Sequence, residues 1–269
     1  MKTKTLIGAF ICAFLLLSAC TAQPVVVDAG SQPTATAQQA KSAAQKQEML
    51  QETAQALVSG IREINYTTDD AIVISGTFYP GTGQDGVILI HMLGNDRTSW
   101  GKLPEALNNE GLAVLAIDLR GHGKSMQETG EYTTFTALNY QHMLYDIKGA
   151  KQFFRKKGLT GSVSLVGASI GANLALTYAA EDTEIKNIVL LSPGENYRGI
   201  LTMVPNEQYR GKMLLVSSEN DISSYAATST LSKRANGIHA FHSYATAGHG
   251  TDMLKESDLI PTIVDWLKK

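Results

Sequence analysis

Residues 163–176 read VSLVGASIGANLAL, and they give the clearest indication of the fold. The apolar run 163–166 leads directly into small residues around Ser169, and a helical pattern follows from Ile170. A strand–turn–helix junction of this kind places its serine in a strained backbone conformation at the carboxyl edge of a sheet. The amino end of the helix then favours negative charge on that oxygen. The stretch predicts a nucleophilic serine, although a glycine-rich packing junction with an idle serine would give the same letters.

Short apolar runs alternate with helical patterns on both sides of this junction. This alternation implies right-handed crossovers and a mostly parallel sheet with helices on both faces. A hairpin over residues 64–79 should add antiparallel strands at one edge. We therefore predict one α/β domain over residues 61–269. Its expected strands are residues 87–91, 113–118, 163–166, 188–191 and 213–216, and its expected helices are residues 98–109, 135–157, 170–180, 224–236 and 251–268.

Three motifs give the chain a resemblance to the α/β-hydrolase family. Residues 167–171 fit the G-x-S-x-G nucleophile elbow, and residues 118–125, DLRGHGKS, are similar to the family's D-x-R-G-x-G-x-S stretch. Residues 91–94, HMLG, stand where the family usually carries H-G-x-G. The resemblance extends over most of residues 61–269. It implies the α/β-hydrolase fold, with a mostly parallel central sheet, helices on both faces and an N-terminal antiparallel hairpin.

The resemblance also implies a catalytic acid that orients the base. A serine hydroxyl needs a base to take its proton, and that base needs a carboxylate to hold its tautomer. In this fold the order along the chain is serine, acid, histidine. Asp221 lies in the loop after the strand 213–216, where the family's acid usually lies. Glu219 is its rival, and Asp252 is a more distant one because it follows the histidine.

Six histidines compete for the role of the base. His249 lies in a glycine-flanked loop between the last strand and the final helix, which is the family's position for this residue. His242 is its serious rival. His239 and His242 are three residues apart on a strand and face opposite sides, which argues against a metal pair. We therefore predict a catalytic triad of Ser169, Asp221 and His249.

The resemblance assigns the oxyanion hole to the backbone amides of Leu93 and Ile170. Met92 replaces the first glycine of the family's H-G-x-G loop, so the geometry of the Leu93 donor is the point to examine. A serine rather than an aspartate at the elbow argues against a dehalogenase or an epoxide hydrolase. No metal or organic cofactor is expected.

The substrate pocket should be open, because only residues 194–211 are available for a cap after the strand 188–191. Two helices and a connection need roughly 25 residues or more. This favours a carboxylesterase or acyl hydrolase over a lidded lipase. Tyr197 and Met203, together with Met92, are the candidate substrate contacts, although residues of the short segment could equally pack the loop onto the domain.

The first twenty residues read as a secretory signal. Lys2 and Lys4 precede an apolar run over residues 6–17, which is short for a membrane span. Residues 17–20, LSAC, resemble the lipobox of bacterial lipoproteins, which implies cleavage before Cys20 and acylation of that cysteine. An ordinary signal cleaved near Ala22 is the alternative. We predict a signal over residues 1–19, a tether with a helix over 20–60, and the hydrolase domain over 61–269.

Composition excludes several function classes. The net charge is −2, so no basic excess is available to neutralise nucleic acid phosphates. Hydrophobic residues make up 43% of the chain and charged residues 18%, as expected for a folded protein. Cys12 would leave with the signal and Cys20 would carry lipid, which leaves no thiol for a nucleophile or a metal site.

The expected function is that of a lipid-anchored serine hydrolase that cleaves carboxylic esters through an acyl-enzyme. Its expected partners are a small-molecule or lipid-like ester and a membrane of the bacterial cell envelope, the outer membrane if the host has one. A thioesterase, an amidase or peptidase, or an acyltransferase could use the same triad. A non-catalytic envelope binding protein with a hydrolase fold is the alternative of a different class. The sequence predicts no oligomeric state.

Overall fold

The computed structural model describes residue 42 and residues 46–47, 60–127 and 129–268. The predicted signal, Cys20 and most of the predicted tether and helix over residues 20–60 lie outside the described residues. The chain divides into two units, Met1–Glu48 and Met49–Lys269, and the sheet belongs to the second.

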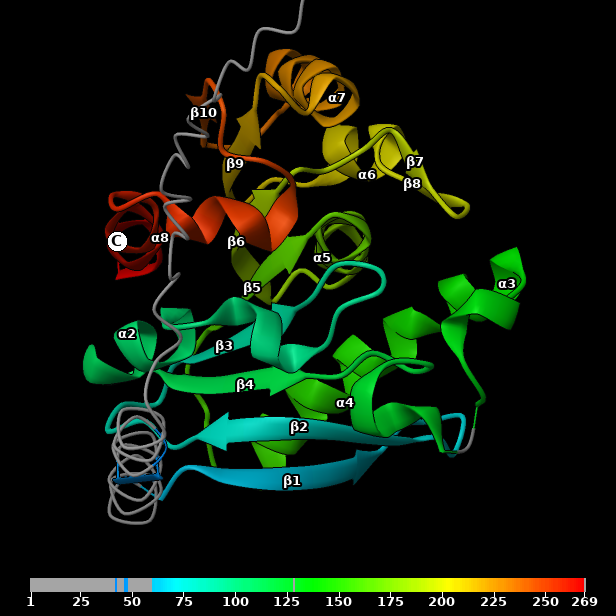
Figure 1. Ribbon diagram of the computed structural model, residues 1–269, viewed down its shortest axis with the longest axis vertical. Coiled ribbons are helices and arrows are strands. Elements are labelled where there is room, and N and C mark those ends of the chain that lie inside the picture. Colours follow the sequence, from blue (N-terminus) through cyan, green and yellow to red (C-terminus); the bar gives the residue numbers. More distant parts are fainter. Residues whose placement is uncertain (1–41, 43–45, 48–59, 128, 269) are drawn as a thin grey trace, which may run out of the picture. The chain divides into compact units, whose positions relative to one another are not determined.

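Eight strands of the described chain form one twisted sheet in the order β1-β2-β4-β3-β5-β6-β9-β10 (Figure 1). The strands from β4 to β10 are parallel, whereas β2 is antiparallel to both β1 and β4. The predicted parallel sheet with an antiparallel hairpin at one edge is thus confirmed. The strands are β1 Arg62–Thr67, β2 Val73–Tyr79, β3 Gly86–Ile90, β4 Ala113–Ile117, β5 Val163–Ala168, β6 Ile185–Leu191, β9 Lys212–Ser218 and β10 His239–Tyr244.

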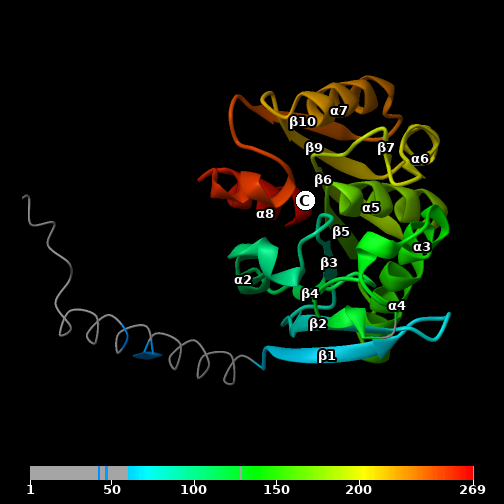
Figure 2. The ribbon, with the colours of Figure 1, turned by 45° about the vertical axis from the view of Figure 1, so that its right-hand side comes forward.

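Helices cover both faces of the sheet, and Figure 2 shows α2 and α8 on one side and α4 and α5 on the other. The central strands are buried on both faces, so their alternate side chains feed two separate hydrophobic clusters. One cluster holds residues of α4 Met143–Lys156, α5 Ile170–Glu181 and α7 Ile222–Arg234. The other holds residues of α2 Leu103–Asn109 and α8 Leu259–Lys268.

Three predicted helices begin or divide differently in the structure. Residues 98–109 form the 3₁₀ helix η1 Arg97–Trp100 and then α2, because Gly101 takes a φ of 53° between them. Residues 135–157 form α3 Ala137–Gln141 and α4, after the short 3₁₀ helix η3 Tyr132–Thr134. Residues 251–268 form the 3₁₀ helix η4 Gly250–Lys255 and α8, since Glu256 is extended. A further 3₁₀ helix, η2, spans Gly123–Met126.

The segment between β6 and β9 contains a small hairpin and one short helix. Strands β7 Asn196–Tyr197 and β8 Ile200–Leu201 pair antiparallel, and α6 Met203–Gln208 follows. Arg198 and Gly199 both have positive φ at the turn, where glycine is the favoured residue type. The segment is fully described and holds no two-helix cap, whereas its hairpin was not predicted.

Candidate active site

The loops that follow β3, β5, β6, β9 and β10 all leave the same edge of the sheet, because these strands are parallel. Ser169 lies directly after β5, Asp221 shortly after β9 and His249 shortly after β10. The three predicted catalytic residues therefore meet at one edge although they are distant in the chain.

Ser169 occupies the sharp turn between β5 and α5. Its φ is 53° and its ψ −119°, and its amide donates to the Leu191 carbonyl at 2.8 Å. Gly167 and Gly171 permit the turn, because a Cβ on Gly171 would lie 2.1 Å from the Ile90 carbonyl oxygen and one on Gly167 would lie 2.2 Å from the Gly171 oxygen. Ser169 can thus adopt a strained conformation because Gly167 and Gly171, on either side of it, have no side chains.

The structure brings Asp221 and His249 into direct contact. His249 Nδ1 lies 2.5 Å from Asp221 Oδ2. An ionised carboxylate only accepts hydrogen bonds, so Nδ1 carries the proton and Nε2 is left as the basic nitrogen. The His249 side chain is 36% exposed and that of Asp221 is 15% exposed, so a substrate can reach the imidazole while the carboxylate stays largely enclosed.

The rival residues lie elsewhere. Glu219 is exposed, and Asp252 lies 3.6 Å from Lys255 across one turn. His242 Nε2 lies 3.5 Å from Asp258 on the edge strand β10. Within the described part of the chain, none of these side chains has a hydrogen bond or ion pair to Asp221 or His249.

Among the described residues, the Ser169 hydroxyl has no hydrogen bond to His249. The partners of His249 Nδ1 are Asp221 and Ser224. The Ser169 hydroxyl instead interacts with the Tyr197 hydroxyl. Burial raises the pKa of Tyr197, and the hydrogen bonds with Ser224 and Ser169 oppose that rise. Hydrogen bonds between a nucleophile and its base are often long without substrate and tighten in the complex. We therefore expect the hydrogen bond between Ser169 and His249 to form when substrate binds.

The amides of Leu93 and Ile170 have no hydrogen-bond partner within the described residues. Ile170 is buried and is the first residue of α5, where amide groups are left free by the helix itself. Leu93 is partly buried against the same cluster. Unpaired backbone amides of this kind are the donors that an oxyanion requires.

The orientation of the Leu93 amide depends on His91. The Met92 carbonyl accepts from the Asn95 amide at 3.2 Å and from His91 Nδ1 at 2.8 Å. A trans peptide points its N–H opposite to its carbonyl, so these two bonds direct the Leu93 N–H away from them. Met92, the departure from the family pattern, therefore leaves the backbone donor free.

His91 is neutral in this arrangement. Its Nε2 accepts from the Leu119 amide at 3.0 Å, which requires the ring proton to be on Nδ1, facing the Met92 carbonyl. Burial, with a smaller contribution from the nearby His122, lowers the pKa of His91 to about 3. His91 therefore holds the loop as a neutral ring and is not a rival base.

The predicted substrate contacts differ in their placement. The Met92 side chain packs beside Gly250 and lies 3.7 Å from Thr251 Oγ1, next to His249 in the chain. Tyr197 lies in the site, with its ring edge-on to the His249 ring at 6.3 Å. Met203 begins α6, and none of its described contacts involves the three candidate catalytic residues.

Two serines in the site were not singled out from the sequence. Ser224 is fully buried, with Oγ 3.4 Å from His249 Nδ1 and 2.9 Å from the Tyr197 hydroxyl. Ser192 has a φ of 50°, and its Oγ accepts from the Gly250 amide at 2.9 Å. Neither position carries a sequence signal, because each contact joins segments that meet only through the sheet.

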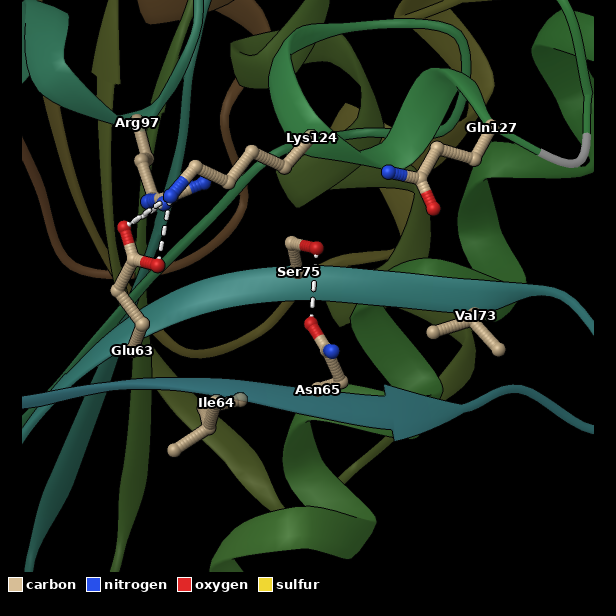
Figure 3. Close-up of a pocket in the computed structure, with 8 residues that line it drawn as sticks. All are labelled: Glu63, Ile64, Asn65, Val73, Ser75, Arg97, Lys124 and Gln127. Carbon is tan, nitrogen blue, oxygen red and sulfur yellow. Dashed lines mark hydrogen bonds and ion pairs between the residues drawn. The ribbon is translucent and has the colours of Figure 1, made fainter.

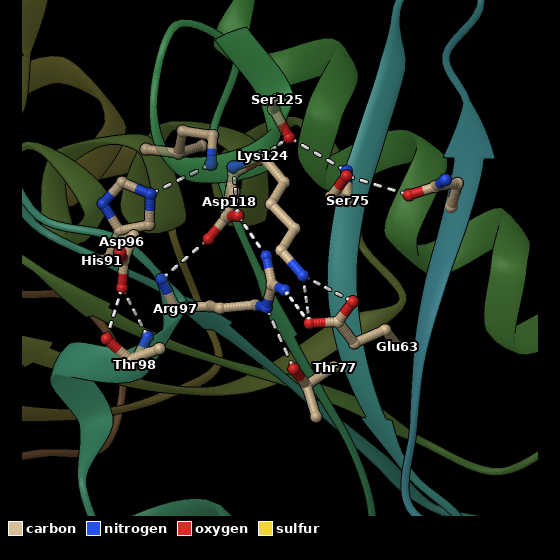
Figure 4. A network of polar contacts seen from close by, with 12 residues as sticks. Glu63, Ser75, Thr77, His91, Asp96, Arg97, Thr98, Asp118, Lys124 and Ser125 are labelled. Atoms are coloured by element: carbon tan, nitrogen blue, oxygen red, sulfur yellow. Dashed lines mark hydrogen bonds and ion pairs between the residues drawn. The ribbon is translucent and has the colours of Figure 1, made fainter. Parts of the chain in front are cut away.

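The D-x-R-G-x-G-x-S stretch supports the loops around the site through buried charge (Figure 4). Asp118 is ion-paired with Arg97 and accepts from the amides of Arg97 at 2.9 Å and Lys124 at 2.8 Å. Glu63 on β1 in turn contacts Arg97 at 2.7 Å and Lys124 at 2.6 Å. The motif thus ties the loop after β4 to η1 and to the hairpin.

A polar pocket of about 280 Å³ adjoins this network on the hairpin, as Figure 3 shows. Glu63 points across it toward Lys124 and Arg97, while Ser75 and Asn65 bond each other at 2.9 Å. Its cations are already paired with carboxylates, so the pocket is structural and lies apart from the candidate triad.

No group of three or more His, Cys, Asp or Glu side chains could hold a metal ion in the described part of the chain. Within the same part, no helix has the length and apolar character that crossing a membrane would require.

A family model described as the alpha/beta hydrolase fold matches residues 86–237, more than half of the chain. The chain belongs to this family. No curated protein sequence matches the hydrolase chain. Among solved structures it is similar to an esterase of Pyrococcus furiosus, with a TM-score of 0.65 and 19% identity over 77% of this chain and 90% of that one.

Two further solved structures share the fold. A dienelactone hydrolase from Anabaena variabilis has a TM-score of 0.64 and 17% identity over 77% of this chain and 96% of that one. An acetyl xylan esterase from a Paenibacillus species has a TM-score of 0.64 and 17% identity over 77% of this chain and 84% of that one. At such identities these similarities establish the fold of the α/β-hydrolase domain.

Proposed function

We propose that the protein is a serine hydrolase that cleaves carboxylic esters through an acyl-enzyme. The observation that carries the proposal is the 2.5 Å contact between His249 and Asp221, at the sheet edge where Ser169 is held in its strained turn. The unpaired amides of Leu93 and Ile170 support it. Esterases among the structural neighbours favour an ester over the thioester, amide and acyl-transfer alternatives.

The mechanism follows from these positions. His249 Nε2 takes the Ser169 proton as Oγ attacks the carbonyl carbon, and Asp221 stabilises the resulting imidazolium. The two amides bind the oxyanion. The imidazolium then protonates the leaving alcohol, and a water activated by the same His249 hydrolyses the acyl-enzyme. The absence of a two-helix cap between β6 and β9 supports an open site for this chemistry.

A fluorophosphonate probe tests the nucleophile. The wild type should be labelled on Ser169 and should hydrolyse 4-nitrophenyl esters, whereas Ser169→Ala should do neither. Absence of labelling would refute the serine hydrolase and would favour the non-catalytic binding protein. Labelling without turnover of esters of graded chain length would shift the reaction to amides, thioesters or acyl transfer.

We also propose that the protein is anchored by lipid in the bacterial cell envelope. The lipobox-like residues 17–20 support this, and Cys20 would be the attachment point. Mass measurement of the protein from membranes should find a diacyl or triacyl group on Cys20, and Cys20→Ala should leave the membrane fraction. A Cys20→Ala protein that stays in the membrane fraction would contradict the proposal.

A further inference from the structure

Tyr197 is held against the catalytic histidine by the small hairpin β7–β8. Its ring meets the His249 ring edge-on at 6.3 Å and an interplanar angle of 89°. A Cβ on Gly194 would lie 2.6 Å from the tyrosine ring, so that glycine leaves the space in which the ring lies. The side chain is half-buried. Its position is therefore set by the fold and does not depend on a bound substrate.

The Tyr197 hydroxyl belongs to a chain of polar groups that begins at Asp221. Asp221 contacts His249 Nδ1 at 2.5 Å, Ser224 Oγ lies 3.4 Å from the same nitrogen, and the Tyr197 oxygen lies 2.9 Å from Ser224 Oγ. Ser224 is fully buried. These three contacts connect the acid to a phenol beside the nucleophile.

The proton positions along this chain have a consistent direction. Nδ1 of His249 carries a proton, because it faces the Asp221 carboxylate, so the Ser224 oxygen meets a donor there and acts as an acceptor. The Ser224 proton is then free to go to the Tyr197 oxygen. The Tyr197 O–H is then directed to the nucleophile, because Ser169 is its remaining side-chain partner among the described residues and the Ser192 carbonyl is 3.5 Å away.

We propose that Tyr197 is a catalytic residue that donates a hydrogen bond to the leaving oxygen of the ester. The inference rests on the proposed serine hydrolase function. The oxyanion donors come from Leu93 and Ile170, on the loop after β3 and at the start of α5, whereas Tyr197 packs on His249. The leaving oxygen must lie within reach of His249, because that residue protonates it.

In the step that this describes, the carbonyl carbon keeps its new bond to Ser169 Oγ and loses its bond to the alkoxy oxygen. The imidazolium of His249 transfers its Nε2 proton to that oxygen, and the alcohol leaves. Tyr197 remains protonated throughout and stabilises the charge that develops on the oxygen as the bond breaks. Ser224 is a positioning residue, since it acts through the Tyr197 oxygen.

Leaving-group dependence tests the inference, because a poor leaving group needs this donor and a good one does not. For Tyr197→Phe, kcat/KM should fall about 10- to 100-fold on an alkyl ester and less than about threefold on the 4-nitrophenyl ester of the same acid. Ser224→Ala should show the same selectivity to a smaller extent. The matched control is Tyr209→Phe, which removes a buried tyrosine hydroxyl bonded to the Lys212 carbonyl and should change neither rate.

The outcomes separate this inference from the proposed function. An active wild type with equal losses on both esters in Tyr197→Phe, or with no loss on either, would overturn the role of Tyr197 and leave the serine hydrolase intact. A wild type that is neither labelled by the fluorophosphonate nor active would overturn both. Thermal unfolding of Tyr197→Phe within a few degrees of the wild type is expected, because the ring remains.

Discussion

Replacing His91 by Gln should change how the stability of the protein depends on pH. His91 is fully buried and neutral, and burial lowers its pKa to about 3. In the unfolded chain its pKa is about 6.5. As pH falls below 6.5 the unfolded state therefore binds a proton that the folded state refuses, and stability is lost until the pH reaches about 3.

The size of the effect follows from the interval of pH that is crossed. Between pH 7.5 and 4.5 the wild type should lose about 2.7 kcal/mol through His91, at about 1.36 kcal/mol for each of the two units below 6.5. His91→Gln keeps an acceptor near the Leu119 amide and has no group that titrates. The loss between the two pH values should then be smaller than in the wild type by about the same 2.7 kcal/mol.

Urea unfolding of the wild type and His91→Gln at pH 7.5 and 4.5 measures how much unfolding free energy each protein loses between the two pH values. Titrating groups that are distant from His91 are present in both proteins and cancel in the comparison, whereas His122, whose ring centroid lies 5.0 Å from that of His91, is coupled to it. An equal loss of stability in the two proteins would refute the neutral buried ring. The variant also loses the bond to the Met92 carbonyl. Its hydrolysis rate at pH 7.5 should therefore fall, because the Leu93 amide is less well oriented.

Four further substitutions test other parts of the site. Ser169→Gly should abolish hydrolysis yet raise the free energy of unfolding by about 1 kcal/mol, because glycine relieves the strain at a φ of 53°; a less stable variant in urea would contradict this. Asp221→Asn should lower kcat about 10³- to 10⁴-fold on 4-nitrophenyl esters, and near-normal turnover would remove Asp221 from the mechanism. Gly171→Ala should cost about 1–3 kcal/mol or more in urea unfolding, because its Cβ would lie 2.1 Å from the Ile90 oxygen; unchanged stability would show that the turn can yield. Asp118→Asn should cost about 3–5 kcal/mol, since it leaves the buried Arg97 guanidinium with only the exposed Glu63 carboxylate. A loss below about 1 kcal/mol would show that Glu63 alone satisfies Arg97.

The sheet was predictable because its strands carry local signals. The central runs are apolar on both faces, and the small residues around Ser169 identify the turn that follows β5. The positions of Asp221 and His249 followed from the order of loops in the family, and the structure places them in contact. Helix boundaries were less predictable, because Gly101 and Glu256 interrupt patterns that remain periodic in apolar residues.

The remaining parts of the site depend on contacts between distant segments. The Tyr197–Ser224 bond joins residues 27 positions apart, and neither residue type indicates a site by itself. The His91 ring is positioned by an amide 28 positions away. The Tyr197 side chain was predicted as a substrate contact from its place in the segment after β6, whereas its bond to Ser224 requires the packed structure.

The position of β10 at the edge of the sheet has a consequence for how the protein would fail under stress. The loop that carries His249 follows this strand. Among the described strands β10 pairs only with β9, and its side chains are exposed or half-exposed. Edge strands of this kind open with a smaller free energy than the core does. Mild heat or a low concentration of urea should therefore abolish hydrolysis while the circular dichroism signal of the folded sheet is still unchanged. The loss of hydrolysis under these mild conditions should be reversible on cooling or dilution. Local opening of β10 would then inactivate the protein before the central strands unfold.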